Sequence, residues 1–472
     1  MTGLDARERR VVEAIAAGRD ELVALLSDLV GFDTTARVLG DPARDEAALQ
    51  QHLGDRLAAH GAQVDIWEPP PAETPPGPQI PEGIEFDGRP QLAARFAGSG
   101  GGRSLIFNGH IDVVEASPVE AWTSHPNRAE VRDGRLYGRG ACDMKGGCAA
   151  MAFAAEVLAR EGVSLLGDLT VCTVTDEESW GAGALAAVAH GVAADACIVT
   201  EPSGLDTWVA CRGSLIPTIV VEGRPGHSGV SQPHRLAGGA VNAFEKSLVV
   251  VDALRRLQEE WRGRRDGRHP HLSTGDIIPC VVRSGEWSVT YPARAELTYH
   301  VAHLPAQADA DGWGRPAQRE IEDWIARAAA ADPWLAEHPP EVVWTPGVPA
   351  AEIPEDHPMV ETMQAASAAI GRSGRITGMD SWHDGASFIL AGTPAICFGP
   401  GDLNLAHTTD ESVPVDDLVQ CAQALAVAAM RWCGVAGQGC TTPALPSIPQ
   451  SGDPIIGVKA RGDRRCAFGT HL

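Results

Sequence analysis

Histidine and carboxylate residues gather in five short segments of this sequence. The residues there that could hold a metal ion or move a proton are His110 and Asp112 in NGHIDVV, Asp143 in GRGACDMKGG, Glu177 and Glu178 in TDEES, Glu201 in EPS, and His407 in AHTTDES. Zinc binds neutral imidazole and carboxylate oxygen, and a carboxylate between two ions can bridge them. Two histidines with several carboxylates therefore match the ligand set of a hydrolase that uses two metal ions.

The spacing within two of these segments indicates a division of roles. His110 and Asp112 are two residues apart, so in an extended segment their side chains lie on one side. The Asp112 carboxylate can then accept a hydrogen bond from the imidazole nitrogen that does not bind metal. Glu177 and Glu178 are adjacent and point to opposite sides, which suits one metal ligand and one general base.

The predicted elements bring these segments to one edge of a sheet. Buried strands are expected at residues 105–108, 169–175, 196–200 and 393–398, and helices at 147–160, 183–190 and 415–433. Strands that alternate with helices indicate a largely parallel sheet covered on both faces. Ligands of such sheets bind beyond the carboxyl ends of the strands, which is where the five segments lie.

The pattern changes after Cys211. Strands at 214–222, 276–283, 287–291 and 295–302, with helices at 237–264 and 318–330, predict an antiparallel sheet covered by helices. We therefore expect an α/β fold in which a mostly parallel catalytic domain, residues 1–211 and 346–433, is interrupted by an inserted α+β domain at 212–345. Residues 434–472 are rich in Gly, Pro, Ser and Thr without periodicity, and predict a flexible tail.

Composition narrows the class of protein. The 472 residues include 62 Asp and Glu against 38 Lys and Arg, a net charge of -24, which disfavours nucleic acid and anionic membranes as partners. No apolar run reaches the ~20 residues of a membrane span, and the N-terminus lacks the features of a signal peptide. The 11 Cys form no CxxC pair, which indicates reduced thiols and a cytoplasmic protein.

Taken together, HIDVV, GRGACDMKGG, DEE, EPS and AHTTDES resemble the co-catalytic zinc aminoacylase and peptidase family, which includes acetylornithine deacetylase, succinyl-diaminopimelate desuccinylase, aminoacylase and carboxypeptidase G. The resemblance covers roughly residues 20–433. It implies a zinc-binding α/β domain and an inserted lid that also mediates dimerisation, hence a homodimer. It also implies a cis peptide bond between Asp143 and Met144.

The resemblance assigns a role to each site residue. His110 and Glu201 would hold one zinc ion, Glu178 and His407 the other, with Asp143 as the bridge, Glu177 as the general base and Asp112 as the carboxylate behind His110. The lid segment GRPGHSG places His227, which in relatives reaches the active site of the partner subunit and hydrogen-bonds the developing oxyanion. Two Zn²⁺ per chain are expected, and Co²⁺ or Mn²⁺ would fit the same donors.

The substrate-binding residues depart from the family pattern. Val289 and Ala302 stand where relatives carry an Asn and an Arg that commonly recognise a substrate carboxylate. A displaced clamp from Arg294 or Arg283 is one alternative. The segment GMDSWHDGASF adds further candidate substrate contacts, for which loop and core packing is the competing interpretation: Trp382, His383 and Asp384.

These features predict a metal-dependent hydrolase of linear amides with a small-molecule substrate. The leading interpretation is an N-acyl amino acid or N-acyl amine deacylase of the acetylornithine deacetylase type. The alternatives are a deformylase or deacylase of a heterocyclic, aminopyrimidine-type amide, and a dipeptidase or carboxypeptidase. A catalytically inactive relative that binds a ligand or partner through the lid is disfavoured, because no predicted metal ligand or base is missing.

Overall fold

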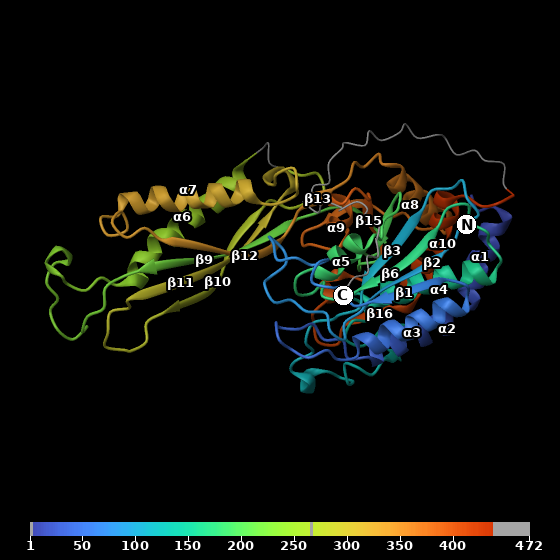
Figure 1. Ribbon diagram of the computed structural model, residues 1–472, viewed down its shortest axis with the longest axis horizontal. Coiled ribbons are helices and arrows are strands. Elements are labelled where there is room, and N and C mark those ends of the chain that lie inside the picture. Colours follow the sequence, from blue (N-terminus) through green and yellow to red (C-terminus); the bar gives the residue numbers. More distant parts are fainter. Residues whose placement is uncertain (1–2, 265–267, 438–472) are drawn as a thin grey trace, which may run out of the picture. The chain divides into compact units, whose positions relative to one another are not determined.

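A nine-stranded sheet forms the centre of the fold in the computed structural model, which describes residues 3–264 and 268–437 (Figure 1). Its strands are β1 (Gln63–Trp67), β2 (Gln91–Phe96), β3 (Leu105–His110), β6 (Leu169–Val174), β7 (Cys197–Val199), β8 (Thr207–Cys211), β13 (Ala351–Glu352), β14 (Ile376–Met379) and β15 (Ala395–Cys397). They follow the order β1-β2-β6-β3-β7-β15-β8-β13, and β14 pairs with β8. The four central strands β6, β3, β7 and β15 run parallel, whereas β1, β2 and β13 pair in antiparallel fashion.

Helices cover this sheet as the alternating pattern predicts. They are α1 (Ala6–Ala17), α2 (Arg19–Gly31), α3 (Glu46–Ala59), α4 (Lys145–Arg160), α5 (Ala182–His190), α8 (Pro358–Ala369), α9 (Gly385–Leu390) and α10 (Val415–Cys433). Helices α1, α2, α4 and α10 pack on one another, and α5 and α9 form a second group against β6, β7 and β15. All six residues of β3 are buried, as expected for a central strand covered on both faces.

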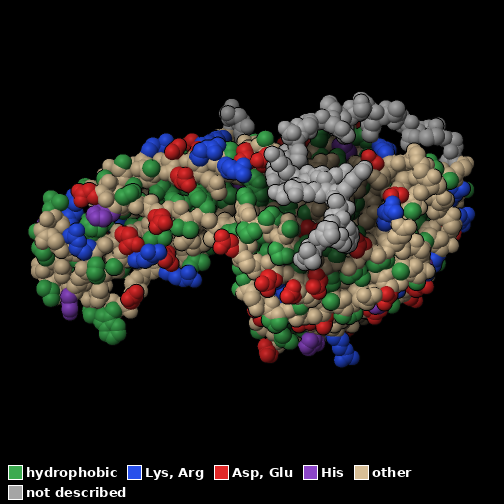
Figure 2. Space-filling view, in the orientation of Figure 1, with side chains coloured by type: hydrophobic (Ala, Val, Ile, Leu, Met, Phe, Trp, Pro, Cys, Tyr) green, Lys and Arg blue, Asp and Glu red, His purple; other side chains and the backbone are tan. Residues whose placement is uncertain are grey.

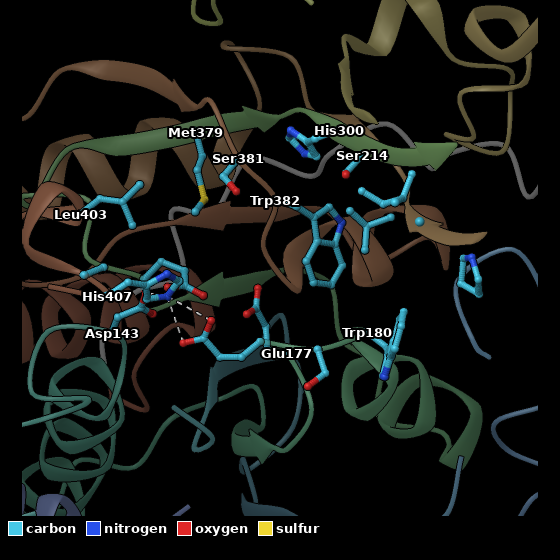
Figure 3. Close-up of a pocket in the computed structure, with 18 residues that line it drawn as sticks. Asp143, Glu177, Trp180, Ser214, His300, Met379, Ser381, Trp382, Leu403 and His407 are labelled. Atoms are coloured by element: carbon cyan, nitrogen blue, oxygen red, sulfur yellow. Dashed lines mark hydrogen bonds and ion pairs between the residues drawn. The ribbon is translucent and has the colours of Figure 1, made fainter. Parts of the chain in front are cut away.

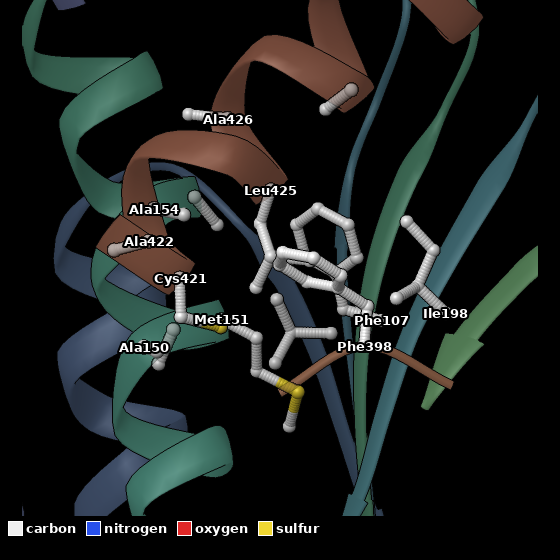
Figure 4. Close-up of a cluster of buried hydrophobic side chains, with 14 of the residues drawn as sticks. Phe107, Ala150, Met151, Ala154, Ile198, Phe398, Cys421, Ala422, Leu425 and Ala426 are labelled. Atoms are coloured by element: carbon white, nitrogen blue, oxygen red, sulfur yellow. The ribbon is translucent and has the colours of Figure 1, made fainter. Parts of the chain in front are cut away.

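The core beside β3 depends on small side chains. Phe107 of β3 and Ile198 of β7 face α4 and α10, whose contacting residues include Ala150, Ala154 and Ala422 (Figure 4). Small residues on both helices allow α4 and α10 to lie close together, while the aromatic rings fill the space above the sheet. The position of α4 is important for the site because the helix begins two residues after Asp143.

A separate antiparallel sheet forms the inserted region. Its strands are β9 (Gly213–Glu222), β10 (Asp276–Ser284), β11 (Arg294–His303) and β12 (Glu341–Val348), in the order β10-β11-β9-β12. Helices α6 (Ala243–Gly263) and α7 (Arg315–Ala331) pack together over it, and their buried residues share a core with Leu297, Tyr299 and Val301 of β11. A small third sheet is formed by β4 (Glu130–Arg132), β5 (Arg135–Tyr137) and β16 (Ser412–Pro414).

The structure confirms the predicted fold class and corrects several elements. The strand predicted at residues 287–291 is wrong: this segment is a turn in which only Thr290 forms a bridge, to His227. The fourth strand of the sheet is instead β12, whose Pro346 and Gly347 obscured the strand pattern. Helix α6 begins later than predicted because Gly238 adopts a left-handed φ of 85° and the Asn242 side chain caps the helix.

The predicted domain boundaries stay predictions, although the antiparallel sheet extends to Val348, three residues past the predicted boundary at 345. Most of the predicted tail, residues 438–472, lies outside the described residues. Within the described part of the chain, no helix has the length and apolar character needed to cross a bilayer. On the face seen in Figure 2, acidic and basic side chains are interspersed.

The close packing of α4 on β7 leads to a stability prediction. A Cβ atom at Gly147 would lie 2.0 Å from the backbone oxygen of Thr200, next to Glu201. Gly147→Ala should therefore displace α4 and lower the free energy of unfolding by about 1–3 kcal/mol, as overpacking commonly does. Chemical denaturation measures this loss.

The matched control is Gly31→Ala in α2, where a Cβ would meet nothing within 4 Å. Alanine favours a helix over glycine by about 0.5–1 kcal/mol, so this variant should be as stable as the parent or slightly more so. Equal stability of the two variants would show that α4 does not approach Thr200 this closely.

Candidate metal centre

Three neighbouring parallel strands bring the predicted ligands together. His110 is the last residue of β3, Glu177 and Glu178 follow the end of β6, and Glu201 follows the end of β7. His407 arrives on the loop after β15, with a left-handed φ of 61°. Because the strands are parallel neighbours, their carboxyl ends meet at one edge, and residues distant in sequence share one site.

Asp143 lies between the two histidines. Its Oδ1 is 3.2 Å from His110 Nε2. Its Oδ2 is 3.3 Å from His407 Nε2, and Figure 3 shows Asp143 and His407 next to each other. Glu201 Oε1 lies 3.5 Å from His110 Nε2, whereas Glu178 Oε2 lies 3.1 Å from His407 Nε2. The donors therefore divide into two groups, one at each oxygen of Asp143.

The donor set fits bound cations. One atom each from His110, Asp143 and Glu178 lie within 4.8 Å of one another, close enough to share an ion. Burial, and then the negative charge of Asp143, raise the pKa of Glu178 to about 7. Burial also raises the pKa of Glu201. These carboxylates repel one another in a poorly solvated site, and divalent cations would relieve that repulsion.

The pKa values of the two histidines are raised as well, which favours their charged forms. Burial opposes protonation of His110, but the neighbouring Glu201 and Glu177 raise its pKa well above the usual value. Hydrogen bonds to Asp143 and Glu178 raise the pKa of His407 to about 10. A metal ion on either imidazole would supply the positive charge that these carboxylates otherwise draw from a proton.

Asp112 supports the site in a way that differs in detail from the prediction. His110 Nδ1 donates to the backbone oxygen of Asp112 at 2.9 Å, and the Asp112 carboxylate is 3.6 Å away. That carboxylate instead accepts the backbone N–H groups of Glu177, at 3.2 Å, and Glu178, at 3.1 Å. Asp112 thus fixes both the His110 ring and the turn that carries the two glutamates.

Glu411 is a site residue that the sequence analysis missed. Its Oε1 accepts the backbone N–H groups of Cys142 and Asp143, at 2.8 and 3.0 Å, and its Oε2 pairs with buried Arg139 at 2.5 Å. Glu411 therefore holds the backbone at Asp143. The sequence feature that could have indicated Glu411 is its place in the AHTTDES segment, close to His407. The peptide between Asp143 and Met144 is cis, which confirms that prediction.

A cavity of about 510 Å³ opens beside the carboxylates. Part of its lining is apolar or aromatic: Trp180, Ile216, Val348, Met379, Trp382 and Leu403. Ser214, His300 and Ser381 add neutral polar groups. Among the described residues that line the cavity there is no Arg or Lys.

The GMDSWHDGASF segment divides between cavity and core. Trp382 lines the cavity, and its contact with a substrate stays a prediction. His383 is buried, its Nδ1 accepts the N–H of Gly385 at 3.1 Å, and burial lowers its pKa to about 4. Asp384 is buried without a hydrogen-bond partner for either carboxylate oxygen among the described residues, and burial raises its pKa to about 8. Neither residue lines the cavity, so their substrate contacts stay predictions.

Two predicted residues lie away from this cavity. The exposed Arg294 pairs with Glu222 at 3.1 Å and Glu296 at 3.0 Å on the antiparallel sheet, and it does not line the cavity. His227 is exposed, and its Nδ1 accepts the N–H of Gly229 at 3.0 Å. The structure of one chain does not bring either residue to the metal ligands.

A parallel sheet whose strand ends converge on a set of metal ligands, together with an inserted antiparallel sheet, defines a class of metal-dependent hydrolases. The model of Peptidase family M20/M25/M40 matches residues 106–431, and the chain belongs to this family. The enzymes of this family are dinuclear metallo-hydrolases, and this chain has a candidate metal site at His110, Asp143 and Glu178. The chain is therefore a metal-dependent amidohydrolase.

Individual relatives carry several activities. The chain is 29% identical to N-formyl-4-amino-5-aminomethyl-2-methylpyrimidine deformylase of Halalkalibacterium halodurans, over 90% of this chain and 98% of the relative. It is 32% identical to succinyl-diaminopimelate desuccinylase of Gluconacetobacter diazotrophicus, over 70% of this chain and 81% of the relative. A tripeptidase structure from Staphylococcus aureus superposes with a TM-score of 0.66 at 18% identity, covering 87% of this chain and 98% of that one, and supports the fold.

The two adjacent glutamates should separate in a metal assay. Fully loaded protein should hold about two metal ions per chain. Glu178→Gln replaces a charged donor with a weak neutral one and should reduce the content toward one ion per chain, while Glu177→Gln should keep both ions. Elemental analysis after dialysis measures the content, and the reverse outcome would mean that the two roles are exchanged.

Proposed function

We propose that this chain is a two-metal deformylase or deacylase that releases a primary amine carried by an aminopyrimidine-type heterocycle. The cavity lining is the observation that carries the proposal. N-acylated ornithine and diaminopimelate derivatives carry carboxylates, for which a buried site needs a positive partner. The described lining offers acidic, neutral polar and aromatic side chains but no Arg or Lys, which suits a planar, uncharged or weakly basic substrate.

The relatives support the same choice. The similarity to the pyrimidine deformylase spans 90% of this chain, whereas that to the desuccinylase spans 70%. The leading interpretation from sequence, an N-acyl amino acid deacylase, is therefore less well supported than its heterocyclic alternative. Trp180 and Trp382 offer flat apolar surfaces in the cavity, on which a pyrimidine ring could stack.

The proposed metal ligands follow the two donor groups. His110 and Glu201 would hold one ion, His407 and Glu178 the other, and Asp143 would bridge them. Zinc is the expected metal because the set combines imidazole and carboxylate, and Co²⁺ or Mn²⁺ would accept the same donors. When bound, a metal pair of this kind supplies Lewis acidity that makes water a nucleophile at neutral pH.

Glu177 is the proposed proton carrier. Its side chain lines the cavity, is 11% exposed, and has Oε2 3.8 Å from His110 Nε2, at the edge of the ligand set. There the carboxylate would accept the proton of the attacking water and return it to the nitrogen of the leaving amine. Its backbone N–H is held by Asp112, so the carboxylate is positioned before substrate arrives.

The proposal is tested by a substrate panel on metal-loaded protein. We expect kcat/KM for N-formyl-4-amino-5-aminomethyl-2-methylpyrimidine to exceed that for N-acetylornithine or N-succinyl-diaminopimelate by about 10²-fold or more, since a carboxylate would be buried without a cationic partner. Glu177→Gln should lower kcat on the preferred substrate by about 10²–10⁴-fold. A higher rate on either amino acid derivative would refute the proposed substrate class.

We also propose that the active form is a homodimer, joined through the inserted sheet, in the cytoplasm. The exposed edge strand β10 carries apolar side chains on its surface, including Ile278 and Val282 at 47% and 54% exposure, which supports pairing with a second copy. The cysteines among the described residues are all free, which supports a reducing compartment.

In such a dimer, His227 would reach the partner's cavity and stabilise the oxyanion. His227→Ala should then lower kcat by about 10²–10³-fold with metal content unchanged. Mixing this variant with Glu177→Gln and allowing subunit exchange should restore part of the activity, because one cavity of the mixed dimer receives both intact groups. Absence of recovery, with heterodimers demonstrated, would place His227 outside the partner's reaction.

A further inference from the structure

The inserted sheet contributes one wall of the cavity. Along β11, Leu297, Tyr299 and Val301 point toward α6 and α7, so the alternating residue His300 points to the opposite face. Ser214 and Ile216, two residues apart on the neighbouring strand β9, line the cavity with His300. The face left uncovered by the helices is therefore the face that lines the cavity.

Three polar side chains on this side have no internal partner. The side chains of His300, Ser214 and Ser381 line the cavity, and none of them makes a hydrogen bond within the described part of the chain. In the view of Figure 3 they lie on one side of Trp382, and Glu177, Asp143 and His407 lie on the other. Their hydrogen-bonding groups are thus available to a ligand whose reacting amide is at the metal ligands.

The backbone around these residues is held in place. Arg212 donates its backbone N–H to the Ser381 oxygen at 3.0 Å and its Nε to the Asp380 oxygen at 2.7 Å. The Asp380 carboxylate accepts the N–H and hydroxyl of Ser273, at 2.8 and 2.6 Å. Ser381 is therefore fixed between β8 and the segment before β10, and it does not need substrate to become ordered.

His300 is suited to a neutral role. Partial burial, and then the positive charge of Arg212, lower its pKa. A neutral imidazole offers one donor and one acceptor, and each serine hydroxyl offers both. The N=C–NH₂ edge of an aminopyrimidine likewise presents an acceptor next to a donor, so the two sets of groups are complementary.

We propose that His300, Ser214 and Ser381 form a neutral subsite that binds the ring nitrogen and exocyclic amino group of a heterocyclic substrate. This inference rests on the proposed function and extends it by naming the residues that select the heterocycle. It also accounts for the absence of a cation from the described lining, because these groups recognise a neutral polar edge in place of a carboxylate.

The test compares two substrates that differ at that edge: the formylated 4-amino-5-aminomethyl-2-methylpyrimidine and its analogue without the 4-amino group. His300→Ala should lower kcat/KM for the first substrate by about 10–10²-fold, mainly through KM, and change that for the analogue by less than about threefold. Ser381→Ala should act in the same direction. His300→Gln, which keeps one donor and one acceptor, should recover part of the loss.

Thr298→Ala is the matched control. Thr298 lies on the same strand and face as His300 and hydrogen-bonds Thr218 at 2.9 Å, but it does not line the cavity, so both substrates should be unaffected. Equal losses on both substrates in His300→Ala would overturn the subsite, because a general disturbance of the lid would act on both.

A binding measurement separates failure of the subsite from failure of the proposed function. Calorimetry on the metal-loaded protein would titrate the product amine, 4-amino-5-aminomethyl-2-methylpyrimidine, and its analogue without the 4-amino group. Tighter binding of the amino-bearing compound, lost in His300→Ala, supports the subsite even if the formylated compound is not hydrolysed. Equal binding of both compounds, or no binding of either, overturns it.

Discussion

Mutual repulsion among buried carboxylates is the constraint on which the rest of this structure depends. Glu177, Glu178 and Glu201 converge with Asp143 at the ends of parallel strands, where solvent is too scarce to separate their charges. Within the described part of the chain, His110 and His407 face these carboxylates, so acidic groups outnumber basic ones in the cluster. Such an arrangement is stable at neutral pH when divalent cations occupy it, and the same cations supply the chemistry of this family.

Several surrounding contacts hold these carboxylates in position. Glu411 and Arg139 fix the backbone at Asp143, and Asp112 fixes the turn after β6. The close approach of Gly147 to Thr200 sets the distance between α4 and β7, and with it the separation of Asp143, just before α4, and Glu201, just after β7. Because interiors are closely packed, a small change in one contact is passed to the ligands.

The inserted sheet forms part of the cavity wall and, in the proposed function, selects the substrate. Its α6 and α7 face is filled by a core of its own, so its other face is available for the cavity. That face presents His300 and Ser214 with Ile216, and thus neutral polar and apolar groups. Families with one hydrolytic centre can acquire different substrates by changes on such a face, since the metal ligands come from a different sheet.

The sequence by itself determined the fold class and the reaction class and predicted the metal ligands, because a ligand set requires particular residue types at successive strand ends, and these are visible as local motifs. It did not determine the part played by Glu411, the displacement of the fourth lid strand to β12, or the positions of Arg294 and His300. Those depend on pairings between residues far apart in the chain, such as Glu411 with Arg139 and β9 with β12. Only the tertiary structure decides which side chains line the cavity, because the helices that cover one face of the inserted sheet determine which face stays open.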